Sequence, residues 1–176
     1  YAFLISDFRL AYVVSHSNLT MPQIYKFTAL WGGMEGSLLL WAWILASYSF
    51  LAVYLNRRKI RNLMPWVTAT LMTTQAFFLG LIAFLMSPFD VIAVGRSIQT
   101  MQDGQGLNAS LQYWAMVIHP PTLYLGYVGF IVPFAFAMAS LIAKAPGDAW
   151  IHITRKWALI AYLFQSAGIL LGALWA

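Results

Sequence analysis

The sequence predicts an all-α, polytopic transmembrane protein with four full spans, a partial first span and a short interfacial helix. Of its 176 residues, 61% are hydrophobic and 9% are charged, and the mean hydropathy is +0.73. A soluble domain carries roughly 25% charged residues, because its surface faces water. The chain also contains long uncharged runs, and about 20 apolar residues suffice to cross a hydrocarbon core of about 30 Å. Composition and run length together therefore indicate a membrane protein.

The expected spans follow from the uncharged runs. Residues 1–5 are apolar and are expected to end a helix whose beginning is missing. Four full spans are expected at residues 37–55, 64–86, 121–143 and 157–176, with loops at residues 6–30, 56–63, 87–120 and 144–156. The chain opens on Tyr1 without Met and stops within an apolar run. We therefore expect residues 1–176 to be a fragment of one integral-membrane domain.

Basic residues are distributed unevenly between the expected loops. The loops after the first and third full spans hold seven of them: Arg57, Arg58, Lys59, Arg61, Lys144, Arg155 and Lys156. The loops on the other side hold three: Arg9, Lys26 and Arg96. Short loops rich in Lys and Arg stay in the cytoplasm, so loops 56–63 and 144–156 are expected there and the other two outside. The same bias accounts for the net charge of +5, so no nucleic-acid partner is implied.

Residues 107–118 have the pattern of a short amphipathic helix. Apolar residues recur at Leu107, Leu111, Trp114 and Ile118, with polar residues between them. This spacing follows one face of a helix, and a helix of this kind lies in the membrane interface. We therefore expect a separate surface helix before the third full span.

His119 lies between this segment and the third span, directly before Pro120 and Pro121. A residue before proline is driven out of the α region, whereas proline is tolerated in a first helical turn. The His-Pro-Pro unit is therefore expected to form a hinge that holds the imidazole at the outer membrane boundary. The imidazole could be an axial haem ligand, a proton carrier, a zinc ligand or only structural. No second histidine lies at metal-ligand spacing, which counts against zinc.

A glycine-rich motif around Glu35 marks the outer start of the first full span, between Trp31 and Trp41. A carboxylate in a first turn is stabilised by the positive end of the helix dipole. Alternatively, the glycines allow close backbone approach and Glu35 holds a cation or a proton near the outer face. Trp31, Trp41 and Trp114 could be interfacial anchors or an aromatic floor for a flat apolar ligand.

Other polar and small residues have simpler interpretations. Gly168 and Gly172 form a small-xxx-small face in the fourth span, which is typical of close helix packing. His16 and His152 fall in expected polar loops and should be solvated. The chain contains no Cys, so disulfides and Cys-ligated metals are absent from it.

Two long motifs carry a resemblance to a known family. One runs from Gly106-Leu107-Asn108 through Val117-Ile118-His119-Pro120-Pro121 to Tyr127-Val128-Gly129-Phe130, and the other spans residues 31–41. Both resemble segments of the family of the cytochrome c-type biogenesis protein CcmF, a haem lyase subunit, and they occur in the same order. The related CcsA-type proteins share the tryptophan-rich segment that is expected beyond residue 176.

The resemblance implies attachment of haem to an apocytochrome c at the outer face of the inner membrane. It implies haem b as cofactor and His119 as an axial ligand of the haem iron, with Trp114 and Tyr124 as candidates for the haem's surroundings. The implied partners are apocytochrome c, the haem chaperone CcmE and thiol-reducing CcmH-type subunits, besides the lipid membrane. The family's other haem ligands lie beyond this sequence, so residues 1–176 alone are expected to be inactive as a haem lyase.

Two other classes stay open at this point. A transporter or channel subunit would use His119 and Glu35 for proton or solute passage. Such a protein is expected to carry a charge inside a span, and the four expected spans contain none. A purely structural membrane subunit would bind no ligand.

Overall fold

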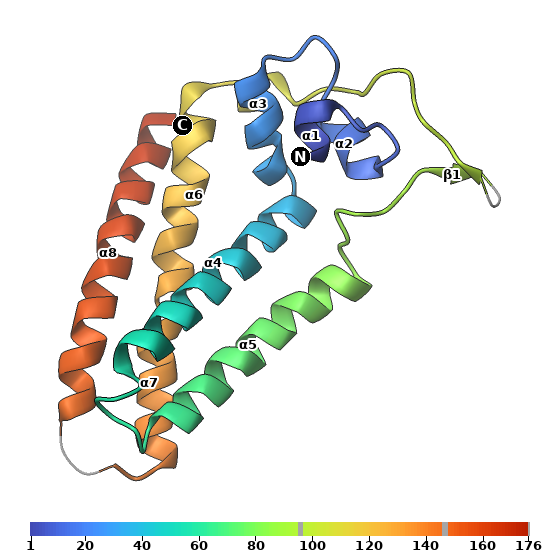
Figure 1. Cartoon of the computed structure of the whole chain (residues 1–176). Coiled ribbons are helices and arrows are strands. Elements are labelled where there is room, and N and C mark those ends of the chain that lie inside the picture. The colour runs from blue at the N-terminus through green and yellow to red at the C-terminus, as the bar shows by residue number, and fades with distance from the viewer. Residues whose placement is uncertain (95–96, 146–147, 176) are drawn as a thin grey trace. The chain divides into compact units, whose positions relative to one another are not determined.

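The computed structural model describes residues 1–94, 97–145 and 148–175 (Figure 1). They divide into two compact units. The first unit comprises Tyr1–Leu40 and Gly80–Ile118, and the second comprises Trp41–Leu79 and His119–Ala176. Two features of the expected topology, the cation Arg96 and the chain end at Ala176, lie outside the described residues.

Four helical segments in the described residues are long and apolar enough to cross a membrane, which confirms the all-α polytopic class. They are α4 (Met34–Asn56), α5 (Met64–Phe84), the consecutive helices α6 (Trp114–Gly129) and α7 (Ile131–Ile142), and α8 (Ala149–Trp175). The expected partial span at residues 1–5 contains the short helix α1 (Ala2–Ile5). The strands among the described residues are β1 (Ala93–Val94) and β2 (Ser97–Ile98), which form one short antiparallel pair.

The helix ends follow local chemistry as well as hydropathy. Helix α4 begins before the expected span, so that Glu35 lies in its first turn, and it ends at Asn56 directly before the basic segment. Helix α8 begins at Ala149, so the expected loop 144–156 is wrong in its second half. Arg155 and Lys156 interrupt the apolar run without ending the helix, because Arg and Lys are good helix formers.

The expected interfacial helix at residues 107–118 is also wrong. Residues 109–111 form the 3-10 turn η2 (Ala109–Leu111), and a single helix, α6, then runs from Trp114 through both prolines to Gly129. His119 is therefore the sixth residue of a continuous helix and does not lie in a hinge. The interruption comes instead at Phe130, where Pro133 has no N–H to donate to the carbonyl of Gly129.

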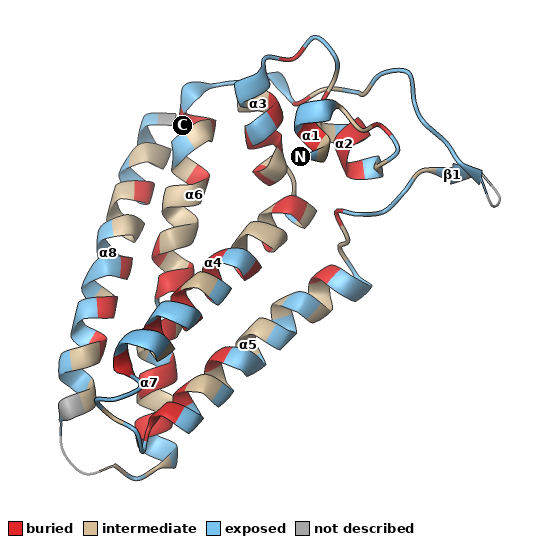
Figure 2. Ribbon diagram, viewed as in Figure 1, coloured by how far each residue is buried: buried red, intermediate tan, exposed pale blue. Residues whose placement is uncertain are grey.

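The first unit shows that residues 6–30 are more than a polar loop. They contain α2 (Ala11–His16), α3 (Gln23–Thr28) and the 3-10 turn η1 (Ala29–Trp31). Buried residues of these elements and of α1 (Figure 2) form one hydrophobic cluster, which includes Phe3, Tyr12 and Val13 and is joined by Leu107. The second expected outer loop joins this cluster through Leu107 and through a backbone hydrogen bond from Gln105 to Val14.

The second unit is a bundle of long helices. Its most deeply buried side chains come from α4, α5, α6 and α7, and they include Leu45, Leu71, Val128 and Phe136. Many large apolar residues of the long helices are exposed, among them Leu163 and Leu170 on α8. Outward apolar side chains are what a lipid-facing helix surface requires.

Candidate functional site

His119 is held in one orientation by a backbone carbonyl of a neighbouring helix. Its Nδ1 atom lies 2.8 Å from the carbonyl oxygen of Gly168 on α8. A carbonyl oxygen can only accept a hydrogen bond, so Nδ1 carries the proton and Nε2 carries the lone pair. This tautomer is the one in which Nε2 can ligate a metal ion, because a hydrogen bond at one ring nitrogen determines the role of the other.

Glycines allow α6 and α8 to approach closely at this histidine. A Cβ atom added at Gly172 would lie 2.7 Å from Cε1 of His119. One added at Gly168 would lie 2.8 Å from Cα of Leu123, and one added at Gly126 would lie 2.6 Å from Cα of Gln165. We call this contact between α6 and α8 the glycine seam. The small-xxx-small face expected in the fourth span is thus the surface that receives the imidazole.

An aromatic cluster lies elsewhere in the second unit. The ring centroid of Trp41 on α4 is 4.9 Å from that of Tyr127 and 5.4 Å from that of Tyr124, both on α6. Phe78 on α5 completes the cluster at 6.0 Å from Trp41. The structure therefore brings together Trp41 and Tyr124. Residues five positions apart project about 140° apart around a helix, so Tyr124 does not share the helix face of His119.

Trp31, in the first unit, supports the helix that carries His119. Its indole N–H donates a hydrogen bond of 2.8 Å to the carbonyl oxygen of Met116. In a regular helix this carbonyl would accept from residue 120, but Pro120 has no N–H. The Trp31 indole thus satisfies a carbonyl that the proline leaves without its helical donor, which explains why α6 continues through the His-Pro-Pro unit.

The other expected site residues occupy separate places. Glu35 is partly buried in the first turn of α4, and its carboxylate makes no hydrogen bond or ion pair within the described part of the chain. Trp114 begins α6 in the first unit, is 48% exposed and contacts Tyr113. His16 is not simply solvated, because its ring packs on Tyr12 with centroids 4.3 Å apart.

His152, by contrast, is solvated as expected. Its side chain is 75% exposed, and Nε2 lies 3.7 Å from the carboxylate of Asp148. Gln75 on α5 links two helices, since its amide donates to the carbonyl oxygen of Ala42 on α4 at 3.2 Å. The amide oxygen of Gln165 is buried in the glycine seam without a hydrogen-bond donor among the described residues.

The donor set around His119 fits haem better than it fits a bare metal ion. Within the described ranges, no group of three or more His, Cys, Asp or Glu residues could hold a metal ion. Zinc usually requires at least three protein ligands, whereas the porphyrin supplies four nitrogen ligands to haem iron and needs only axial ligands from the protein. One oriented imidazole meets that lesser requirement.

The fold and the site define a polytopic helical membrane protein in which a neighbouring helix orients one histidine. The family model described as cytochrome C assembly protein matches residues 31–176, and the chain belongs to this family. Over its whole length it is 42% identical to the cytochrome c-type biogenesis protein CcmF of Pseudomonas aeruginosa and 39% identical to that of Haemophilus influenzae. It is 38% identical over 99% of its length to CcmF of Escherichia coli.

The chain spans 26% of the length of each of these relatives. No solved structure matches the chain. Sequence reasoning missed the contact between His119 and Gly168 and the hydrogen bond from Trp31 to Met116. The signals that pointed toward them were the Gly168–Gly172 spacing and a proline pair inside an apolar run.

Proposed function

We propose that this chain contributes to the covalent attachment of haem to apocytochrome c, with His119 as an axial ligand of the haem iron. The observation that supports the proposal is the hydrogen bond from Nδ1 of His119 to the Gly168 carbonyl, which selects the tautomer that ligates metals through Nε2. Membership of the cytochrome c assembly family supports the choice of haem. Haem b is the form of haem that has free vinyl groups for this reaction.

The residues of this chain would bind and orient the haem, and would not react with it. A bound haem supplies the vinyl groups that become thioethers on cysteine thiols. This chain has no Cys, so those thiols belong to the apocytochrome. The Gly168 carbonyl would fix the ring orientation of the His119 imidazole, as acceptors on ligating histidines do in other metal sites.

The proposed orientation in the inner membrane places His119 outside, where it would meet apocytochrome c, a CcmE-type haem chaperone and CcmH-type thiol reductants. The excess of Lys and Arg after the first and third spans supports this orientation. Reporter fusions at Lys59 and Lys156 should therefore give cytoplasmic signals, and those at Asn18 and Gln105 should give outer signals. A cytoplasmic signal at Gln105 would place His119 on the wrong side for this function.

Replacing His119 by Ala in the full-length protein tests the proposed ligand. We expect unchanged membrane insertion, lower haem content and reduced cytochrome c maturation, because the axial ligand is lost. Added imidazole should restore part of the maturation by occupying the vacated axial position. The matched control is His152→Ala, which removes an exposed imidazole of the same chain. Wild-type haem content and maturation in His119→Ala would show that the ligand assignment is wrong.

A further inference from the structure

The second unit collects cations at the end where α4 and α7 finish and α5 and α8 begin. Seven basic residues lie there: Arg57, Arg58, Lys59, Arg61, Lys144, Arg155 and Lys156. Within the described residues, none of them makes an ion pair. The acidic residue of the second unit, Asp148, is 79% exposed and lies 3.7 Å from His152. Seven cations against one carboxylate give this end of the unit a large net positive charge.

A groove between the end of α4 and the start of α8 brings two of these cations together. It has a volume of about 390 Å³, and Lys59 and Lys156 line it together with His152. Leu55, Trp157 and other apolar side chains line the rest of it. The cations come from two different elements, the segment after α4 and the first turns of α8, so the groove depends on the fold and not on one basic stretch.

We propose that this groove binds the phosphodiester headgroup of an anionic phospholipid. The phosphate would lie between the ammonium groups of Lys59 and Lys156, and the start of an acyl chain would lie along Leu55 and Ile160. Leu55 is 53% exposed and Ile160 is 43% exposed, so apolar surface is open to lipid beside the cations. Lys156 and Ile160 are one helical turn apart, about 6 Å along α8, which suits a headgroup above a chain. Basic pockets between transmembrane helices are known to bind anionic phospholipid headgroups.

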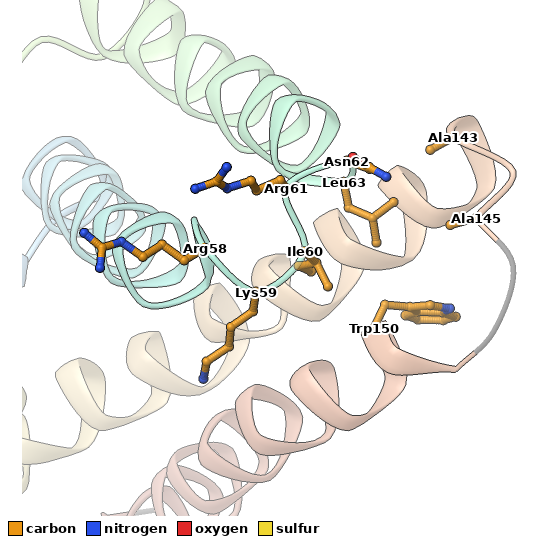
Figure 3. A pocket seen from close by; sticks show the side chains of 9 residues that line it. All are labelled: Arg58, Lys59, Ile60, Arg61, Asn62, Leu63, Ala143, Ala145 and Trp150. Carbon is orange, nitrogen blue, oxygen red and sulfur yellow. The ribbon is translucent and has the colours of Figure 1, made fainter.

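A second hollow at the same end is a poorer match for an anion. It has a volume of about 520 Å³ and is lined by Arg58, Lys59, Arg61 and Trp150 among others. Figure 3 shows that the three cationic side chains extend away from Trp150. Their charged groups therefore do not converge on the hollow, and we assign the phosphate to the groove between α4 and α8.

The alternative explanation is the general preference of Lys and Arg for cytoplasmic loops. That preference depends on charge and not on a groove, so variants of equal charge separate the two explanations. Lys59→Gln with Lys156→Gln removes both cations of the groove. Lys144→Gln with Arg155→Gln removes two cations from the same end, and neither of them lines the groove.

The test uses the full-length protein in phosphatidylcholine nanodiscs that contain phosphatidylglycerol, with retained lipid counted by native mass spectrometry. The wild type should retain phosphatidylglycerol in preference to phosphatidylcholine. The groove variant should weaken this retention on the order of thirty-fold, as loss of two interfacial cations predicts, and the control variant should weaken it far less. Unfolding temperatures of the two variants, measured in parallel, should agree.

Three results would overturn the proposal. Equal losses in the two double variants would show diffuse attraction to the membrane surface. Equal retention of phosphatidylcholine by the wild type would show that no anionic headgroup is selected. Displacement of phosphatidylglycerol by millimolar inorganic phosphate would show that the groove recognises free phosphate and not a lipid.

Discussion

Replacing Gly172 by Ala would insert a methyl group directly against the ring of His119. The added Cβ would lie 2.7 Å from Cε1, 3.3 Å from Nδ1 and 3.4 Å from Nε2. Carbon atoms in contact prefer separations of at least about 3.5 Å, so the ring has to retreat by roughly 0.8 Å. A retreat of that size directly away from α8 would lengthen the 2.8 Å bond to Gly168 to about 3.6 Å, beyond the range of a hydrogen bond.

The expected cost follows from two effects. Overpacking a close helix contact costs about 1–3 kcal/mol, and the lost hydrogen bond adds about 1 kcal/mol. A helical Ala is more favourable than Gly by about 1 kcal/mol, which offsets part of this cost. We therefore expect a net loss of about 1–3 kcal/mol in the free energy of unfolding. Haem binding should also weaken, because the ring of His119 leaves its position beside Gly168.

The assay is haem titration of the purified full-length variant, with the unfolding temperature measured in parallel. Gly80→Ala on α5 is the matched control, because a Cβ there would meet no atom within 4 Å. The control should retain wild-type haem affinity and gain only the helical preference for Ala. If Gly172→Ala binds haem as tightly as Gly80→Ala does, the glycine seam does not position His119 and the reasoning fails.

Two further predictions concern the first unit. Trp31→Phe removes the donor to the Met116 carbonyl and should destabilise the protein by about 1–3 kcal/mol, measured by thermal unfolding in detergent. The control Trp43→Phe, at a 67% exposed position, should change the stability little. Equal effects of the two substitutions would contradict the role of the Trp31 indole. The side-chain hydrogen bond from Arg9 lowers the pKa of Asp7, so the interaction stabilises the fold above the ordinary aspartate pKa and is lost as the pH falls through the lowered value. Arg9→Gln should raise the pKa of Asp7 in an NMR titration, and an unchanged titration would contradict this pairing.

The sequence predicts the membrane spans well because hydropathy acts locally. Residues 37–55 and 64–86 were expected as spans, and α4 and α5 cover nearly these ranges. The start of α8 was expected too late, because Arg155 and Lys156 end the uncharged run in the sequence. They do not end the helix, because a helix requires only its backbone hydrogen bonds, which these side chains do not prevent.

The His-Pro-Pro unit shows why the site was harder to predict. Local rules place His119 outside a helix, and these rules are correct for an isolated peptide. In the protein, the Trp31 indole satisfies the Met116 carbonyl that Pro120 leaves without its helical donor. That partner is 85 residues away in sequence, so no local pattern reveals it.

The same limit applies to the glycine seam. The spacing of Gly168 and Gly172 predicts a close helix contact, and this contact exists. Spacing on one helix does not say which residue of another helix lies opposite. Only the register between α6 and α8 brings His119 to Gly168, 49 residues away along the chain.

The most direct test of the central claim is a ligand exchange at His119 in the full-length protein. His119→Met replaces an imidazole by a thioether, and the axial ligand determines the optical and magnetic spectrum of haem iron. The account predicts that the spectrum of one haem in the purified variant changes from histidine to thioether ligation, or that this haem is lost. The protein should remain folded in either case. A haem spectrum identical to that of the wild type, at equal haem content, would contradict the assignment of His119 as an axial ligand.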